Sequence, residues 1–350
     1  MRKALRFTAF GLLLGALASC SLFDYSNIVV HKYALVYGVT RYTMAALPSA
    51  GPNLTYPGAD ASSMASTLAS QGYVVQSRWV DNAGSVWVNG TNTGLSIGSP
   101  ATNTTDGSVI TGTPGSGDAQ APTKGSIIAD IQALTPTLGS NDVLVVYFSG
   151  HGTQDNTVTP YREYFDPYQG VLQYTPNGQY YDFPVPSVRD DELRSTFDAI
   201  KTPRKVLILD TCNSGGFIGN QLETDWTAPS SAGTLAFVSP ATLVQAIANY
   251  LRMQSSPTGL SPYGTAMVLS AAGRDELSYE SSSYGHGVMT YWLLQGLAGP
   301  ADLNHDGNIT ALESFAYAKA GVDQNSNPSV GSASSFEPHV SGGPVDYVLF

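Results

Sequence analysis

Two segments of the sequence end an apolar run with a side chain that can act in catalysis. The first, VLVVYFSGHG at 143–152, places His151 between two glycines directly after the apolar stretch. The second, KVLILDTCNSGG at 205–216, places Cys212 before a pair of glycines in the same way. A free thiol has a pKa of about 8.5 and stays largely protonated at neutral pH, so a neighbouring imidazole can activate it as a nucleophile. The pair therefore predicts nucleophilic catalysis by Cys212.

Both segments are predicted to be buried strands that end at the same edge of a sheet. Continuous apolar runs rich in β-branched residues are typical of strands that are covered on both faces. Open α/β sheets place their chemistry at the carboxyl ends of such strands, which would bring His151 and Cys212 side by side. The alternatives are a turn that happens to contain a histidine and a buried, inert cysteine.

Strand and helix patterns alternate along the chain. Apolar runs predict six strands, at 33–39, 73–80, 142–148, 205–210, 265–271 and 343–350. Helical patterns occur at 60–70, 124–136, 188–200 and 287–297. This alternation indicates an α/β fold with a mostly parallel sheet and helices on both faces. Residues 81–122 contain no Lys or Arg and many Gly, Ser, Thr and Asn, which predicts an exposed insertion, either a hairpin or a disordered segment.

The two motifs resemble those of the caspase-like cysteine peptidases, and most closely those of bacterial metacaspases. YFSGHG is similar to the histidine motif of that family, and DTCNSGG to its Asp-x-Cys-x-Ser-Gly motif. Other segments agree in order, namely KYALVYGVTRY (32–42), YPGADASSMASTLASQGYVV (56–75), MVLSAAGRDELSYE (267–280) and GHGVMTYWLLQGL (285–297). The resemblance implies a caspase-like peptidase domain over 32–350, built on a mostly parallel six-stranded sheet.

The resemblance also implies a role for each matching residue. Cys212 would be the nucleophile and His151 the general base and acid, while the backbone N–H groups of Gly152 and Cys212 would form the oxyanion hole. Asp210 and Asp60 match the acidic floor of the metacaspase specificity pocket, which implies cleavage after Arg or Lys. For Asp60, the alternative is a charge at a helix N-terminus that the dipole stabilises.

A second histidine, His286, also lies between glycines, in YGHGVMTYW. The segment before it has no strand pattern, and the segment after it is apolar and helix-like. We therefore expect His286 to be a loop or capping residue and not a second catalytic base.

The segment DLNHDGNITALE at 302–313 fits the calcium loop of an EF-hand. Its glycine occupies the sixth loop position, where the loop needs a sharp turn. The alternative is an Asx-rich turn between two helices. Its expected Ca²⁺ ligands occupy loop positions 1, 3, 5, 7 and 12, and are Asp302, Asn304, Asp306, Asn308 and Glu313.

A second calcium site is suggested by the resemblance to metacaspases. In that family an Asp-Asp pair helps to bind an activating Ca²⁺, and Asp190 and Asp191 match it, with Asp166 as a third ligand. This chain differs from the family pattern at one place, because it has Gly219 and Asn220 where the family has a further aspartate. The alternative is that the pair only interacts favourably with a helix dipole.

The first residues of the chain are typical of an export signal. Three basic residues precede the apolar run 7–17, which is too short to span a bilayer comfortably. LASC, ending at Cys20, resembles a bacterial lipoprotein signal, which implies a cleaved segment 1–19, a lipidated Cys20 and a linker at 20–31. Ser21, in place of Asp, favours the outer membrane. The alternative is an ordinary secretory signal with a chance cysteine.

Composition limits the partners that this protein can have. The net charge is −11, so nucleic acid and anionic membrane surfaces are not expected, and membrane contact would be through the lipid anchor alone. Only two cysteines are present, so with Cys20 lipidated Cys212 is a single thiol in an envelope compartment that favours disulfides. A single thiol in such a compartment is at risk of oxidation, so we expect Cys212 to have a function.

We therefore predict a monomeric, exported cysteine endopeptidase that acts on peptides or proteins with a basic residue before the scissile bond. Two alternatives belong to other functional classes. A catalytically silent caspase-like binding module would not need both His151 and Cys212, and this chain has both. A calcium-dependent surface interaction protein would explain the anchor and the calcium loop, but not the two strand-end motifs.

Overall fold

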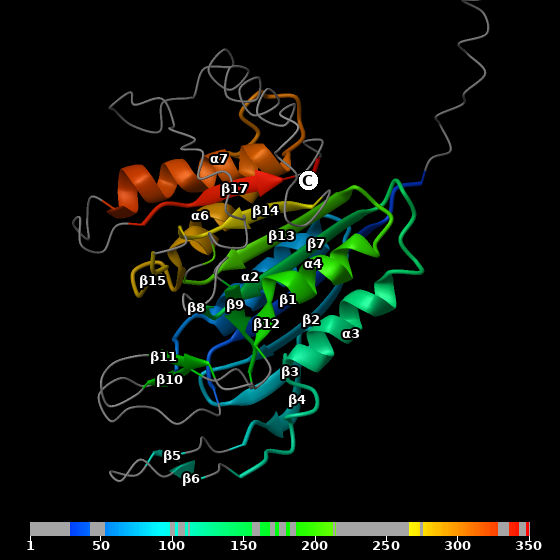
Figure 1. Cartoon of the computed structure of the whole chain (residues 1–350). Coiled ribbons are helices and arrows are strands. Elements are labelled where there is room, and N and C mark those ends of the chain that lie inside the picture. The colour runs from blue at the N-terminus through cyan, green and yellow to red at the C-terminus, as the bar shows by residue number, and fades with distance from the viewer. Residues whose placement is uncertain are drawn as a thin grey trace, which may run out of the picture.

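A central eight-stranded sheet runs through the molecule (Figure 1). Its strand order is β17-β14-β13-β7-β1-β2-β3-β4, in which the five strands from β14 to β2 are parallel and the others are antiparallel to their neighbours. The strands are β1 (Lys32–Val39), β2 (Val74–Val80), β3 (Ser85–Val88), β4 (Thr91–Ser96), β7 (Val143–Ser149), β13 (Arg204–Asp210), β14 (Met267–Ser270) and β17 (His339–Gly342). The structure is a computed structural model that describes residues 29–42, 53–98, 102–103, 109–110, 113–155, 162–168, 172–174, 180–182, 187–212, 214, 266–273, 276–327, 336–342 and 348–349.

The mostly parallel α/β sheet is confirmed, but the predicted number of six strands is wrong. The extra strands β3 and β4 form a hairpin inside the predicted insertion 81–122 and extend the sheet beyond β2. Asn89 and Gly90 connect them with φ angles of 49° and 75°, the left-handed conformation that two-residue hairpin turns need. At the other side of the described sheet the outermost strand is β17, which was not predicted. The predicted last strand, 343–350, lies mostly outside the described residues and stays a prediction; of its two described residues, Val348 forms a bridge with Thr310.

Helices cover both faces of the sheet. Alternate residues of each central strand point to opposite faces, so that Val36 and Leu35 belong to two separate hydrophobic clusters. One cluster packs the sheet against α2, α6 and α7, and the other packs it against α3 and α4. The helices are α2 (Pro57–Ser70), α3 (Lys124–Leu134), α4 (Asp190–Asp198), α6 (Val288–Leu297), α7 (Ala311–Gly321) and the π-helix η4 (Val322–Ser326).

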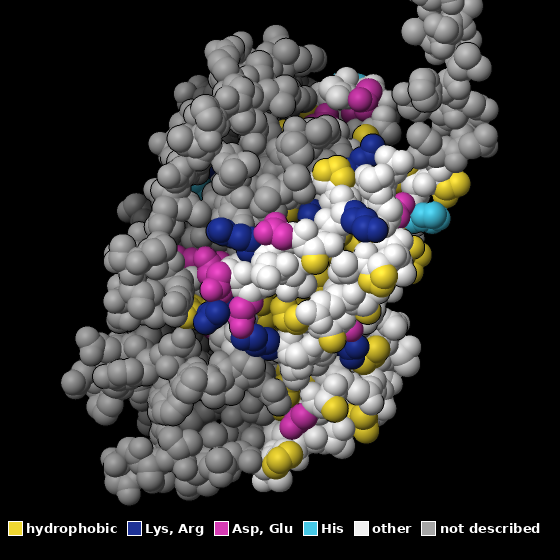
Figure 2. Space-filling view, turned by 45° about the vertical axis from the view of Figure 1, so that its right-hand side comes forward, with side chains coloured by type: hydrophobic (Ala, Val, Ile, Leu, Met, Phe, Trp, Pro, Cys, Tyr) yellow, Lys and Arg dark blue, Asp and Glu magenta, His cyan; other side chains and the backbone are white. Residues whose placement is uncertain are grey.

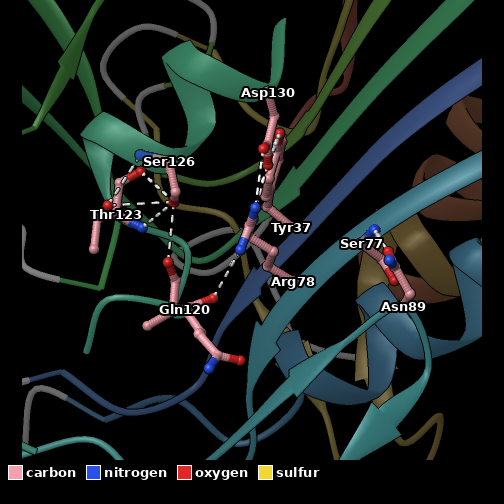
Figure 3. A network of polar contacts seen from close by, with 9 residues as sticks. Tyr37, Ser77, Arg78, Asn89, Gln120, Thr123, Ser126 and Asp130 are labelled. Carbon is pink, nitrogen blue, oxygen red and sulfur yellow. Dashed lines mark hydrogen bonds and ion pairs between the residues drawn. The ribbon is translucent and has the colours of Figure 1, made fainter. Parts of the chain in front are cut away.

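A buried polar network fixes α3 against the sheet (Figure 3). Asp130 of α3 accepts hydrogen bonds from Arg78 Nε at 2.8 Å and Nη2 at 3.0 Å, and from Tyr37 Oη at 3.2 Å. Arg78 therefore compensates the buried carboxylate, which would otherwise be strongly destabilising. Thr123 caps the same helix in a capping box with Ser126. These contacts hold α3 across β1 and β2, the strands that lead toward the site described below.

Small sheets extend from the edges of the core. β8 begins at His151 and pairs with β9, which pairs with β12, while the other small sheets are two-stranded. Their strands are β5 (Thr102–Asn103), β6 (Val109–Ile110), β8 (His151–Asp155), β9 (Arg162–Asp166), β10 (Leu172–Tyr174), β11 (Tyr180–Asp182), β12 (Val188–Arg189), β15 (Glu280–Ser281) and β16 (His286–Gly287).

Charges of both signs are interspersed on the surface seen in Figure 2, where Lys and Arg side chains lie beside Asp and Glu side chains. Lys124 pairs with Glu192 at 2.6 Å, and Arg189 pairs with Asp191 at 2.9 Å. Within the described ranges, no helix combines the length and the apolar character that crossing a membrane would require.

Candidate active site

The strands that carry His151 and Cys212 are neighbours in the sheet. β7 and β13 pair in parallel, and their last register partners are Ser149 and Asp210. Contact continues beyond the ladder, because the N–H of Gly150 donates to the carbonyl oxygen of Asp210 at 3.3 Å. His151 and Cys212 each follow two residues after these partners. The structure thus brings the predicted base and the predicted nucleophile to the same edge of the sheet.

Gly152 packs directly against the nucleophile segment. A Cβ at this position would overlap with the carbonyl oxygen of Cys212 and would lie 2.8 Å from Thr211 Oγ1, so only a glycine fits without a shift. The backbone of Gly152 is therefore beside Cys212, as the predicted oxyanion hole requires. Thr211 Oγ1 is buried and has no hydrogen-bond partner among the described residues.

The Cys212 thiol is half-buried, and its surroundings favour the protonated form. Its Sγ donates to the carbonyl oxygen of Ser278 at 3.7 Å. Burial raises the pKa of the Cys212 thiol to about 11, because it disfavours the thiolate, and the nearby carboxylates Asp210 and Asp166 act in the same direction. Attack by this sulfur therefore requires a base that removes its proton.

Tyr42 contacts the predicted base and was not anticipated from the sequence. Its phenolic oxygen accepts a 2.7 Å hydrogen bond from the backbone N–H of His151, and the two rings lie 4.9 Å apart. Tyr42 is 2% exposed and follows β1. The sequence contains no signal for this contact, since 109 residues separate the two partners.

The two predicted pocket residues, Asp60 and Asp210, lie close together. Asp60 is in the first turn of α2, and Asp210 ends β13; they are 0% and 5% exposed. Gly287 lies between them, because a Cβ built there would overlap with Asp210 Oδ2 and would be 3.1 Å from Asp60 Oδ2. α2 reaches this position because Gly38 of β1 has no side chain, and a Cβ there would overlap with the carbonyl oxygen of Pro57.

Hydrogen bonds satisfy both carboxylates. Asp210 accepts from Ser278 Oγ at 2.7 Å, from Thr290 Oγ1 at 2.6 Å and from Thr290 N–H at 3.0 Å. Asp60 accepts from Ser149 Oγ at 2.9 Å and from the N–H of Gly287 at 3.2 Å. Burial raises the pKa of Asp210, and raises that of Asp60 to about 6, although these hydrogen bonds oppose the shift.

His286 is more than the expected loop or capping residue; that it is not a second catalytic base stays a prediction. It forms β16 with Gly287, and its Nδ1 lies 2.7 Å from Asp60 Oδ1. The imidazole is thus part of the acidic site, 226 residues from its partner in the sequence. Glu280 of the neighbouring strand β15 accepts from the N–H groups of Thr55 and Tyr56, which joins the chain before α2 to the same region.

The predicted calcium loop at 302–313 contains a tight turn around Gly307, and calcium binding there stays a prediction. Asp302 accepts from the N–H groups of Asp306 and Gly307, and His305 and Gly307 have φ angles of 60° and 87°. Glu313 is engaged elsewhere: it accepts from the N–H groups of Asn304 and Thr310 in the capping box of α7. Asn308 donates its N–H to Asp306 Oδ1. Within the described chain, no three His, Cys, Asp or Glu side chains form a preassembled metal cluster.

The residues of the second predicted calcium site have other partners. Asp166 accepts from Ser187 Oγ at 2.6 Å and is the register partner of His151 across β8 and β9. Asp191 pairs with Arg189, and Asp190 accepts from the N–H of Asp191 at 2.8 Å. These three aspartates are not a preassembled cluster in the described chain either, so this site stays a prediction.

Several predictions concern residues outside the described ranges. They are the signal segment 1–19, the lipidation of Cys20 and the departure from the metacaspase pattern at Gly219 and Asn220. Residues 29–31 are the described part of the predicted linker, and His31 contacts Asp142. Export to the bacterial envelope and the monomeric state also stay predictions.

Comparison with known proteins gives a family match over most of the chain. The model of the caspase domain matches residues 31–335. No curated protein matches the sequence significantly. Among solved structures, protein GSU0716 from Geobacter sulfurreducens is 16% identical, with 90% of this chain and 95% of that chain covered and a TM-score of 0.47. Caspase-1 from Spodoptera frugiperda is 12% identical, with 89% and 86% covered and a TM-score of 0.42. Both structural likenesses are weak, so the family assignment depends on the family model.

Proposed function

This chain belongs to the caspase-domain family of cysteine peptidases, and from that membership we propose that it is an endopeptidase of metacaspase type that cleaves after Arg or Lys. The observation that carries the proposal is the placement of His151 and Cys212 at equivalent positions on the adjacent strand ends of β7 and β13. Peptides or proteins are the substrates that the family implies.

The mechanism uses a thiol that is protonated at rest. The imidazole of His151 takes the proton of Cys212 as the sulfur attacks the scissile carbonyl carbon, and a tetrahedral intermediate forms that carries an oxyanion and still holds the amide nitrogen. The N–H groups of Gly152 and Cys212 donate to this oxyanion. When the intermediate collapses, the C–N bond breaks and the imidazolium protonates the leaving amine. Water, activated by the same imidazole, then hydrolyses the thioester and restores the thiol.

Specificity for a basic residue follows from the two buried carboxylates. Asp60 and Asp210 lie on either side of Gly287, next to the strand end that carries the nucleophile. A guanidinium or ammonium group that enters this region is attracted by both, whereas the carboxylate of an Asp side chain is repelled. We therefore place Asp60 and Asp210 at the base of the pocket that receives the residue before the scissile bond.

A panel of fluorogenic peptides tests the proposal. The peptides end in Arg, Lys, Asp or the neutral norleucine, and are offered to wild-type protein and to Cys212→Ala, with calcium or with chelator. We expect hydrolysis after Arg and Lys by the wild type only. An equal melting temperature of the two proteins is the control for folding. Hydrolysis that persists in Cys212→Ala would overturn the proposed function, because the reaction would then not use this thiol. No hydrolysis of any peptide in either condition would also overturn it and would favour a silent binding module.

We also propose that Ca²⁺ binds the loop 302–313 as a brace for the fold. The loop has the turn and the ligand spacing of an EF-hand, and it joins the end of α6 to the start of α7. Asp302, Asn304 and Asp306 would supply side-chain oxygens and Asn308 its carbonyl oxygen. Glu313 would have to exchange its bonds in the capping box for the metal. The ion would hold two helices together and screen the acidic loop.

A further inference from the structure

His286 covers the acidic pair. The imidazole Nδ1 and the N–H of Gly287 are both within hydrogen-bond distance of Asp60 Oδ1, while Oδ2 receives Ser149 Oγ and the same N–H of Gly287. Both oxygens of Asp60 are thus engaged, and the carboxylate is 1% exposed. The imidazole is 20% exposed and is therefore the part of this pair that solvent reaches.

The groups that face His286 from the surrounding elements are acidic or neutral. Asp60 lies on α2, and Asp210, at the end of β13, interacts electrostatically with the imidazole. Glu280 lies on β15, the strand that pairs with β16. Two neutral groups are close to the same carboxylates, Tyr147 of β7 and the thiol of Cys212. A protonated His286 therefore cancels negative charge at the place where the proposed substrate cation would bind.

We propose that His286 is a specificity-determining residue that acts as a proton gate. When the imidazole is protonated, its positive charge neutralises that of Asp60 and weakens binding of a basic side chain. When the imidazole is neutral, both carboxylates are left to hold the cation. This inference rests on the proposed function, because it assigns a regulator to the same pocket. Neutral imidazole can still donate from Nδ1 to Asp60, so loss of the ring's second proton changes the charge without breaking the contact.

The position of the pair makes the gate effective near neutral pH. Burial raises the pKa of Asp60 to about 6, so this carboxyl, which His286 contacts at 2.7 Å, exchanges its own proton close to neutral pH. A cation that binds beside the pair favours the state with fewer protons. By linkage, the affinity for the cation rises as the pair loses its proton, and the bound cation lowers the titration midpoint by the same factor.

Benzamidine, a planar cation similar to the Arg side chain, is a suitable probe. Cys212→Ala protein carrying ¹³C-labelled histidine is titrated by NMR without and with saturating benzamidine. The His286→Gln variant, which keeps an N–H donor toward Asp60, identifies the His286 signal among the five histidines of the chain. We expect saturation to lower the midpoint of His286 by about one pH unit or more, which corresponds to an affinity gain of about tenfold across the titration.

His31→Gln is the matched control. His31 also places Nδ1 near an aspartate, Asp142 Oδ1 at 3.1 Å, but it precedes β1 at the opposite end of the sheet. We expect this variant to bind benzamidine with the affinity and pH dependence of its parent. The His286→Gln variant, in contrast, should release fewer protons when benzamidine binds. Calorimetry in buffers of different ionisation enthalpy measures the number of protons released.

Two results would overturn the proton gate. One is benzamidine binding that leaves the His286 midpoint unmoved, and the other is the lack of benzamidine binding at every pH. Either result can coincide with Cys212-dependent peptide hydrolysis, in which case the proposed peptidase survives and the gate alone is wrong. If Cys212-dependent hydrolysis is itself missing, the proposed function fails.

Discussion

The backbone N–H of His151 donates to the phenolic oxygen of Tyr42 at 2.7 Å, with the imidazole 4.9 Å from the phenol ring. Tyr42 follows β1, while His151 follows β7, the strand beside it. The residue that we assign as the base is therefore held from both sides, by Tyr42 beyond the end of β1 and by the segment of Cys212 beyond the end of β13.

Tyr42→Phe removes this hydrogen-bond acceptor and keeps the ring. The N–H of His151 then loses its partner in a partly buried place, which typically costs about 1–3 kcal/mol. We expect a decrease of about that size in the free energy of unfolding, measured by denaturant titration, and a fall in kcat for the Arg peptide with little change in KM. Unchanged stability and unchanged kcat would show that Tyr42 does not position His151.

The alkylation of Cys212 by iodoacetamide should depend steeply on pH. Burial raises the pKa of the thiol to about 11, so the reactive thiolate is scarce at neutral pH in the free protein and increases about tenfold for each pH unit up to that value. We expect slow modification at pH 7 and a rate that still rises between pH 9 and 10. Mass spectrometry of the peptide that contains Cys212 measures the rate. A plateau already at pH 7 would mean that His151 holds a preformed thiolate.

Asp210→Asn tests the acidic pocket without changing its shape. Asparagine can still accept from the N–H of Thr290, but it carries no charge for a basic side chain. We expect kcat/KM for the Arg peptide to fall about 10- to 100-fold, the usual effect of losing a charged hydrogen bond, and that for the norleucine peptide to change much less. Asp142→Asn, the same change at the opposite end of the sheet, is the control. Equal losses on both peptides would indicate a structural role for Asp210.

Calcium should stabilise the protein through the loop 302–313. An ion that binds only the folded state adds about 2.7 kcal/mol at a hundredfold excess over its dissociation constant, which raises the melting temperature by on the order of 5 °C. We expect this shift in Cys212→Ala protein, and a much smaller one after Asp306→Ala is added. Asp191→Ala, in the second predicted site, should leave the shift intact. If Asp191→Ala removes it instead, the ion binds there, and if calcium has no effect, the loop is only a turn.

Local sequence determined the strands, the helices and the two reactive strand ends. Continuous apolar runs around Val145 and Leu207 can only be buried on both faces, and the glycines after His151 and Cys212 end them at one edge. These signals depend on neighbouring residues, so they can be read without knowing the fold. For the same reason the hairpin turn at Asn89-Gly90 was present in the sequence, although the attachment of that hairpin to β2 was not.

Tertiary structure decided which distant side chains meet at that edge. The contact of His286 with Asp60 and that of Tyr42 with His151 join segments 226 and 109 residues apart, and no local pattern encodes such a distance. From the sequence alone, His286 was predicted to be a loop or capping residue because the residues that follow it begin a helix. Its ring instead faces a carboxylate from α2, since α2 and α6 pack side by side on the same face of the sheet and leave the buried Asp60 in need of a donor.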